Sequence, residues 1–314
     1  MDQLFTKTFK QLTKADVGIV GGKGASLGEM TNAKIPVPPG FVVLAPAFDR
    51  FLKESGLDSK IEAMLQKLKH TDVASVDRAS VKIRKLILDT DFPKDIGTEI
   101  MKQFSVLHAS LVAVRSSATA EDSSTASWAG ELESYLNVKK EGVLDSVKLC
   151  WSSLFTPRAI FYRFEKKLHK TGVSVAVVVQ AMVQSEVSGI CFTVHPVTKD
   201  YDQMVIEAGL GLGEAIVGGK VTPDTFVVNT KRRQIVDTNI SEQTMMIVRG
   251  PKGTVEKTVP RAKASAQKLP NEVVLKLANL CKNIETHYKK PQDIEWAFSK
   301  GELFIVQSRP ITTL

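Results

Sequence analysis

Cysteine is scarce in this sequence: it has three cysteines among 314 residues, and none of them stands in a CxxC spacing. The three cysteines are Cys150, Cys191 and Cys281. This usage excludes a dense disulfide framework and offers no paired thiolates for a structural zinc ion. We therefore expect reduced thiols and a cytoplasmic location.

Long apolar runs are also missing. The longest run, VAVVVQAMV (175–183), is interrupted by Gln180 and is much shorter than the roughly 20 residues that span a bilayer. The N-terminus, MDQLFTKTFKQLTKADVG, mixes charged residues with scattered apolar ones and does not resemble a secretory signal. We expect no membrane partner.

Clustered basic charge is absent as well, although 42 basic and 34 acidic residues give a net charge of +8. The basic residues are spread among short groups, such as KLKH (67–70) and KRR (231–233), without interleaved aromatic residues. Because nucleic-acid binders concentrate basic residues on one face, we expect no nucleic-acid partner. A distributed positive surface instead suits an anionic small molecule or an acidic protein.

Helical and strand patterns alternate along the chain without internal repeats, which indicates an α/β (α+β) fold with two lobes. The first half combines a strand at 41–45 with apolar residues at helical spacing between 47 and 104. The second half has short apolar strands, then an amphipathic helix over 272–290 and two final strands, DIEWAF and LFIVQSR. Residues 240–266 are polar and poorly periodic, and we expect a mobile segment there.

Two widespread phosphate-binding motifs are near matches only. In AGLGLGEAIVGGK (208–220), both GxGxxG and the Walker pattern GxxxxGK[ST] require a glycine where Glu214 stands. A tight turn from a strand into a helix explains these glycines equally well. GGKGASLGEM (21–30) is more informative, because Lys23 lies between two glycines at a turn entering a helix, where an anion is favoured. An exposed lysine on a tight turn is the alternative.

The two final strands carry a distinctive set of polar residues. Strand alternation places Asp293 and Glu295 on one face of DIEW, and Gln307 and Arg309 on one face of IVQSR. If SKGE makes a hairpin, these faces lie opposite each other. Carboxylate and amide oxygens suit a Mg²⁺ ion that bridges phosphates, and arginine matches phosphate oxygens. A surface hairpin with a cross-strand salt bridge is the alternative.

Six blocks of sequence, taken in order, are more specific than any single motif. They are GGKGASLGEM, VRSSATAEDSSTASWAG, CWSSLFTPRAIFYR, VVVQAMVQSEVSGICFT, VIEAGLGLGEAIVGGKVTPDTF and DIEW–IVQSRPIT. The series resembles the N-terminal nucleotide-binding domain of phosphoenolpyruvate synthase (pyruvate, water dikinase). It is similar, more loosely, to pyruvate phosphate dikinase and rifampicin phosphotransferase. The resemblance extends from about Val17 to Thr313.

This resemblance implies an ATP-grasp-like, two-lobed nucleotide-binding domain with ATP held between the lobes. We expect an N-terminal lobe over 1–179, with the Lys23 turn and a phosphate-covering loop, and a C-terminal lobe over 180–314, with a magnesium and phosphate hairpin. The resemblance implies the following set of contacts: Lys23 and Arg115 to ATP phosphates; Gly130 and Ser134 in the covering loop; Gln180, Ala181 and Met182 to adenine, largely through backbone groups; Asp293, Glu295 and Gln307 to Mg²⁺; and Glu295, Gln307 and Arg309 to the nucleotide.

The covering loop explains why VAVRSSATAEDSSTASWAGE (112–131) contains so many small and hydroxyl-bearing residues after Arg115. Small residues permit motion, and hydroxyls and backbone amides can hydrogen-bond phosphate oxygens. Arg115 is expected to stay anchored on the strand beneath. A disordered linker is the alternative interpretation.

In the family, ATP gives its β-phosphoryl group to a histidine on a swivelling domain, leaving AMP and phosphate, and pyruvate is phosphorylated on a third domain. The charge that develops would be neutralised by Lys23, Arg115, Arg309 and Mg²⁺. We expect this chain to be incomplete without a phosphohistidine domain and an acceptor-substrate domain, in the same full-length chain or in a separate subunit. A rifampicin-type phosphotransferase domain and a non-catalytic nucleotide-binding module remain alternatives.

Overall fold

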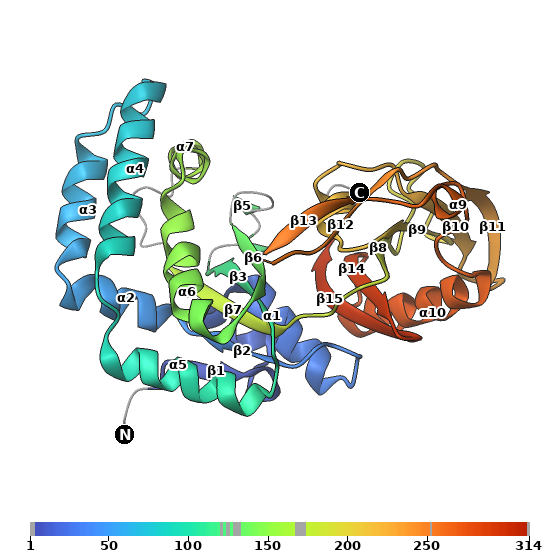
Figure 1. Cartoon of the computed structure of the whole chain (residues 1–314), viewed down its shortest axis with the longest axis horizontal. Helices are drawn as coiled ribbons and strands as arrows, with labels where there is room; N and C mark the ends of the chain where they lie inside the picture. Colours follow the sequence, from blue (N-terminus) through green and yellow to red (C-terminus); the bar gives the residue numbers. More distant parts are fainter. Residues whose placement is uncertain are drawn as a thin grey trace. The chain divides into compact units, whose positions relative to one another are not determined.

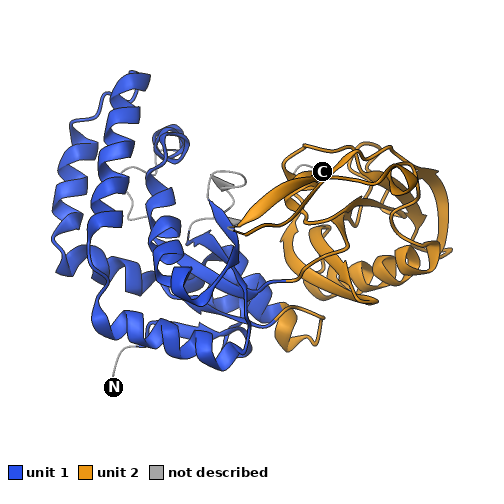
Figure 2. Ribbon diagram, in the orientation of Figure 1, with its two compact units in different colours: residues 1–29, 39–182 blue, residues 30–38, 183–314 orange. Residues whose placement is uncertain are grey.

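The computed structural model describes residues 4–119, 122–123, 126–127, 133–166, 174–251 and 253–312. The chain divides into two compact units: unit 1 comprises residues 1–29 and 39–182, and unit 2 comprises residues 30–38 and 183–314 (Figure 2). From the sequence we expect a division between residues 179 and 180; the structure has it after Met182 and assigns residues 30–38 to unit 2. The expected mixture of helices and sheets is confirmed.

Unit 1 is built on an antiparallel sheet with the strand order β1-β2-β7-β3-β6 (Figure 1). The strands of this unit are β1 (Thr6–Thr8), β2 (Gly40–Val43), β3 (Val112–Ala118), β6 (Ser134–Val138) and β7 (Val175–Ala181), with the short pair β4 (Asp122–Ser123) and β5 (Ala126–Ser127). Strand β7 is central and is buried from Val175 to Gln180. Its continuous apolar sequence, rather than an alternating one, follows from burial on both faces.

The helices of unit 1 enclose an aromatic core. They are α1 (Val17–Asn32, whose last residues belong to unit 2), α2 (Ala45–Glu54), α3 (Leu57–Gln66), α4 (Val73–Asp89), α5 (Lys94–Leu107), α6 (Val143–Ser152) and α7 (Pro157–Glu165), with short 3-10 turns at Phe9–Gln11, Lys14–Asp16, Lys140–Gly142 and Ser153–Phe155. The Trp151 ring centroid lies 5.4 Å from that of Phe48, 5.1 Å from that of Phe51 and 5.0 Å from that of Phe92. The helical spacing between residues 47 and 104 is thus confirmed as α2 to α5.

Unit 2 contains an antiparallel sheet with the strand order β11-β10-β9-β8-β14-β15 and a separate hairpin, β12-β13 (Figure 1). The strands are β8 (Val187–Phe192), β9 (Gln203–Leu210), β10 (Asp224–Asn229), β11 (Gln234–Asn239), β12 (Met245–Arg249), β13 (Thr254–Thr258), β14 (Gln292–Ser299) and β15 (Glu302–Pro310). The helices are α8 (Glu214–Val217), α9 (Arg261–Ala264) and α10 (Asn271–Tyr288). Gly211, at φ 87°, makes the turn between β9 and α8, which confirms the strand-to-helix interpretation of residues 208–220.

Helix α10 covers one face of this sheet and contacts β9, β10 and β14 (Figure 1). Its buried residues include Val274, Leu277 and Cys281, and the buried sheet residues include Ile206 and Ile294. The polar residues that alternate with these apolar ones therefore lie on the opposite face of the sheet.

Among the residues that the structure describes, no helix is both long enough and apolar enough to cross a membrane.

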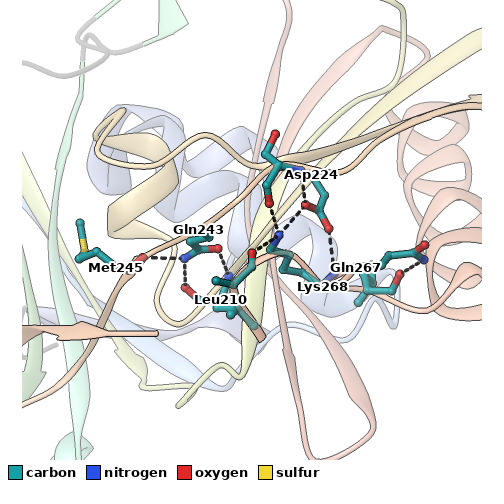
Figure 3. A network of polar contacts seen from close by, with 9 residues as sticks. Leu210, Asp224, Gln243, Met245, Gln267 and Lys268 are labelled. Atoms are coloured by element: carbon teal, nitrogen blue, oxygen red, sulfur yellow. Dashed lines mark hydrogen bonds and ion pairs between the residues drawn. The ribbon is translucent and has the colours of Figure 1, made fainter. Parts of the chain in front are cut away.

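Residues 240–266, where we expect a mobile segment, contain the β12-β13 hairpin and α9. Ile247 and Val259 are 2% and 4% exposed and anchor this segment. The Gln243 side chain hydrogen-bonds the backbone at the end of β9 as a neighbouring strand would. Its Oε1 accepts from Leu210 N at 2.8 Å, and its Nε2 donates to Leu210 O at 3.0 Å and to Met245 O at 2.9 Å (Figure 3). The segment lacks periodicity because side-chain hydrogen bonds, rather than a continuous apolar face, hold part of it.

A buried ion pair attaches the end of the same segment to the sheet. Lys268 Nζ lies 2.9 Å from Asp224 Oδ1, and both side chains are completely buried (Figure 3). Lys268 N donates to the other carboxylate oxygen at 2.8 Å, and Ser241 N donates to Oδ1 at 3.0 Å. The ammonium group also donates to the carbonyl oxygens of Ser241 and Ala264. Each charge is thereby matched by hydrogen bonds, as burial requires.

Candidate nucleotide site

Lys23 lies just after a break in α1. Gly21 has φ 68° and ψ 171°, so the helix is interrupted there and restarts. A Cβ atom at Gly21 would lie 2.3 Å from Ser117 Oγ, so only glycine fits at this approach to β3. Ser117 Oγ donates to Val20 O at 2.9 Å and accepts from Gly24 N at 3.3 Å, which joins the two helical segments. The expected turn is confirmed, although the helix already begins at Val17.

The break positions Lys23 against β3. Lys23 is half-buried, and its Nζ donates to Ser116 O at 3.0 Å. Arg115 precedes Ser116 on the same strand, is 9% exposed and is paired across the sheet with Ser134 on β6. Lys23 therefore contacts the residue that follows Arg115 on β3, and Ser134 is the cross-strand partner of Arg115.

Gly130 and much of the predicted phosphate-covering loop lie outside the described residues. The described residues on either side of that stretch are held by hydrogen bonds. Thr119 donates twice to Ser174 O, from its N and its Oγ1, both at 3.1 Å. On the other side, Glu133 O accepts from Ser116 N at 3.2 Å and from Ser116 Oγ at 2.7 Å. Thr119 and Glu133 are thus each fixed by hydrogen bonds to the sheet or to the residue that precedes it.

The residues predicted to lie against adenine form the end of β7. Gln180 is 3% exposed, whereas Ala181 and Met182 are partly exposed. Ala181 N donates to Pro39 O at 2.8 Å, and Met182 N donates to Leu111 O at 3.0 Å. Since both amides already have acceptors, recognition of adenine here would depend on other groups of the segment.

Strands β14 and β15 form the expected hairpin in unit 2, with its turn at Lys300 (φ 53°) and Gly301 (φ 83°). Positive φ at both central residues is the geometry of a two-residue turn that matches strand twist. Asp293 lies opposite Arg309, and Glu295 lies opposite Gln307, so the two polar faces meet across the hairpin. A bulge after Glu295 shifts the register by one residue relative to the pairs nearer the turn, and this shift brings the polar residues opposite each other.

Asp293 and Arg309 also form the cross-strand salt bridge that we weighed as the alternative. Arg309 donates to Asp293 Oδ2 from Nε at 2.8 Å and from Nη2 at 2.7 Å. The Asp293 side chain is 14% exposed and that of Arg309 is 44% exposed. Burial raises the pKa of Asp293 and the Glu295 charge raises it further, while Arg309 opposes both effects. An additional cation beside the Asp293 carboxylate would therefore be favoured, because it would stabilise the charged form.

Glu207 is a residue of this sheet face that the sequence analysis missed. It lies opposite Ile190 on β8, and Ile190 lies opposite Glu295 on β14, so both glutamates belong to one row of the sheet. Burial raises the pKa of Glu207, and the charge of Asp293 raises it further. The signal was present in VIEAG (205–209), where Ile206 is buried and its neighbour must point to the other face.

The side-chain oxygen atoms of the β14-β15 hairpin are of the kind that binds a magnesium ion. Among the described residues, no group of three or more His, Cys, Asp or Glu side chains could hold a metal by itself. Mg²⁺ in phosphate-transfer sites is held by one or two carboxylates, with waters and substrate phosphates completing the octahedron. Asp293 and Glu295, with the amide oxygen of Gln307 opposite, provide such a partial set.

Comparison with known proteins decides the family. The family described as pyruvate phosphate dikinase, AMP/ATP-binding domain, matches residues 17–314. The chain belongs to this family. It is therefore an ATP-grasp-like nucleotide-binding domain, and the resemblance seen in the six sequence blocks is confirmed.

Curated relatives in the dikinase family carry the names expected from the sequence. The chain is 46% identical to the probable phosphoenolpyruvate synthase of Methanocaldococcus jannaschii, over 99% of this chain and 27% of the relative. It is 40% identical to the phosphoenolpyruvate synthase of Pyrococcus furiosus, over 99% and 44%. It is 39% identical to the rifampicin phosphotransferase of Bacillus subtilis, over 97% and 35%. The chain thus spans less than half the length of each of these relatives, which contain further regions.

Proposed function

We propose that the chain binds MgATP and donates the β-phosphoryl group to a histidine of a swivelling domain, as the ATP-binding part of a pyruvate, water dikinase. The observation that carries this proposal is the hydrogen bond from Lys23 to the carbonyl oxygen of Ser116, the residue after Arg115, which is itself paired with Ser134. Two cations and a hydroxyl at neighbouring positions suit the oxygens of a polyphosphate. The phosphohistidine and acceptor domains are proposed to lie in the same full-length chain or in a separate subunit.

Within this proposal, the residues have separate roles. Lys23 and Arg115 bind phosphate oxygens, Ser134 and Gly130 donate hydrogen bonds from the covering loop, and Gln180, Ala181 and Met182 border the adenine. Asp293, Glu295 and Gln307 hold Mg²⁺, which neutralises phosphate charge when bound. Arg309 exchanges part of its interaction with Asp293 for a phosphoryl oxygen. Phosphoryl transfer needs positioning and charge neutralisation more than covalent chemistry from the protein, and these residues are proposed to supply both.

A second candidate function is supported by one specific observation. The chain is 39% identical to a rifampicin phosphotransferase over 97% of its length, against 40–49% to phosphoenolpyruvate synthases. Because a rifampicin phosphotransferase shares this ATP-binding part, an antibiotic as final acceptor is a second proposal. An acceptor assay with pyruvate and rifampicin on the full-length protein distinguishes them.

Calorimetric titration with MgATP tests nucleotide binding directly. We expect Lys23→Met to weaken MgATP binding about 10- to 100-fold, because a charge-assisted hydrogen bond contributes about 1.5–3 kcal/mol. Glu295→Gln should weaken binding of MgATP more than binding of ATP measured without Mg²⁺. Lys231→Met is the control, because Lys231 forms an exposed ion pair with Asp202 on a remote turn of unit 2. Unchanged MgATP affinity in Lys23→Met would contradict the proposed role of unit 1.

A further inference from the structure

Glu133, the residue before β6, makes several polar contacts with residues of α4, β6 and β3. Arg84, on α4, donates through Nη2 to both carboxylate oxygens, at 3.0 and 3.2 Å. The Tyr135 hydroxyl donates to Oε2 of the same carboxylate. The Arg84 and Glu133 side chains are 26% and 34% exposed, so the pair is partly shielded from water. Such a pair holds its geometry better than an ion pair on the open surface.

The backbone of Glu133 is fixed at the same time. Its carbonyl oxygen accepts from Ser116 N and Ser116 Oγ, as described above, and from Cys150 Sγ at 3.9 Å. Ser116 in turn presents its own carbonyl oxygen to Lys23 Nζ at 3.0 Å. A short chain of hydrogen bonds therefore leads from the Glu133 main chain through Ser116 to the Lys23 ammonium group.

Arg115, the second cation proposed to bind phosphate, is connected to Glu133 through the pairing of β3 with β6. Ser134, the next residue after Glu133, is the partner of Arg115 in the pairing of β3 with β6. This pairing has an irregularity between Val112 and Val114, so the Arg115–Ser134 pair is not held by a long, regular ladder. The contacts of Glu133 with Arg84, Tyr135 and Ser116 supply the missing constraint at that end.

We propose that Glu133 is a positioning residue for nucleotide binding. Its contacts with Arg84 and Tyr135 fix the start of β6, and this in turn positions Lys23 and Arg115 to bind phosphate oxygens. The inference rests on the proposed function, since it assigns Glu133 an effect only through those two cations. It also explains why a carboxylate is kept next to residues that bind an anion. Its charge is already matched by Arg84, so it adds little repulsion toward a phosphate.

The test is a double-mutant cycle on MgATP affinity, measured by calorimetry on the 314-residue chain. We expect Glu133→Gln to weaken MgATP binding about tenfold, because small displacements of positioned groups are costly. In the Arg115→Met background the same substitution should cost about twofold or less, because residues that act as a unit are not additive. Arg84→Met should reproduce the Glu133→Gln result, and Arg84→Lys should restore part of the affinity.

Each outcome of this cycle has a defined meaning. If Glu133→Gln binds MgATP as the unsubstituted chain does, or if its effect adds fully to that of Arg115→Met, the positioning role is overturned. If Arg115→Met and Lys23→Met themselves bind MgATP normally, it is the proposed function that fails. Should Glu133→Gln fold poorly, Arg84→Met decides the question, because it leaves the strand end itself unaltered. Arg50→Met, which removes the two ion pairs of Arg50 on α2, with Glu54 and Asp95, is the matched control and should bind MgATP normally.

Discussion

Replacing Arg309 with alanine is expected to lower the rate of phosphoryl transfer to the histidine domain by about a thousandfold or more. MgATP affinity should fall by a smaller factor. The reason is that transition-state charge is spread over the phosphoryl oxygens, and an arginine at that point contributes more to the transition state than to the ground state. The measurement is AMP formation and histidine phosphorylation in a full-length protein that carries the substitution.

The structure provides the reason for choosing Arg309 and a control for it. Arg309 is held by Asp293 through two hydrogen bonds to Oδ2, so its guanidinium group is pre-oriented before nucleotide binds. Arg232→Ala removes an exposed arginine from the turn between β10 and β11 and should transfer phosphate at the normal rate. Normal histidine phosphorylation in Arg309→Ala would remove Arg309 from the transfer mechanism.

Replacing Asp224 with alanine is expected to lower the free energy of unfolding of unit 2 by about 3–5 kcal/mol. The substitution leaves the Lys268 ammonium group completely buried without its counter-ion, and an unpaired buried charge is strongly destabilising (Figure 3). It also removes the acceptor for the backbone amides of Ser241 and Lys268. The melting temperature should fall by about 10 °C in a thermal unfolding experiment followed by circular dichroism.

Two further variants distinguish the effect of the buried ion pair on stability from the effect of the packing around it. Lys231→Ala breaks the exposed Lys231–Asp202 pair and should leave the melting temperature nearly unchanged. Asp224→Leu combined with Lys268→Met removes both charges and should be more stable than Asp224→Ala, because apolar replacements of a buried pair are often tolerated. An Asp224→Ala protein that melts at the normal temperature would show that water or a rearranged side chain compensates the buried lysine.

The parts of the fold that follow from local pattern were predictable from the sequence. Alternation in DIEW and IVQSR was enough to place each polar pair on one face of its strand. It did not give the register, because the two-residue turn alone would put Glu295 opposite Val306, and the bulge after Glu295 brings it opposite Gln307. The helices between residues 45 and 107 follow from apolar spacing in the same way. The glycine break before Lys23 was visible because glycine is needed at positive φ.

The remaining features depend on contacts between residues far apart in the chain. Arg84 and Glu133 are separated by 49 positions, and Asp224 and Lys268 by 44, so no local pattern reveals either pair. The hairpin β12-β13 was missed because it follows a polar stretch whose Gln243 bonds the backbone of Leu210 on β9 and of Met245 on β12, a long-range link that no local pattern shows. Glu207 could have been found from strand alternation, but its relation to Glu295 requires the order of β9, β8 and β14.

A crystal structure of the chain with Mg²⁺ and a non-hydrolysable ATP analogue tests the central claim most directly. The account predicts phosphate oxygens within hydrogen-bonding distance of Lys23 Nζ and the Arg115 guanidinium group, and a metal ion bound to the Glu295 carboxylate. A triphosphate bound away from Lys23 and Arg115, with no ion at Glu295, would contradict it.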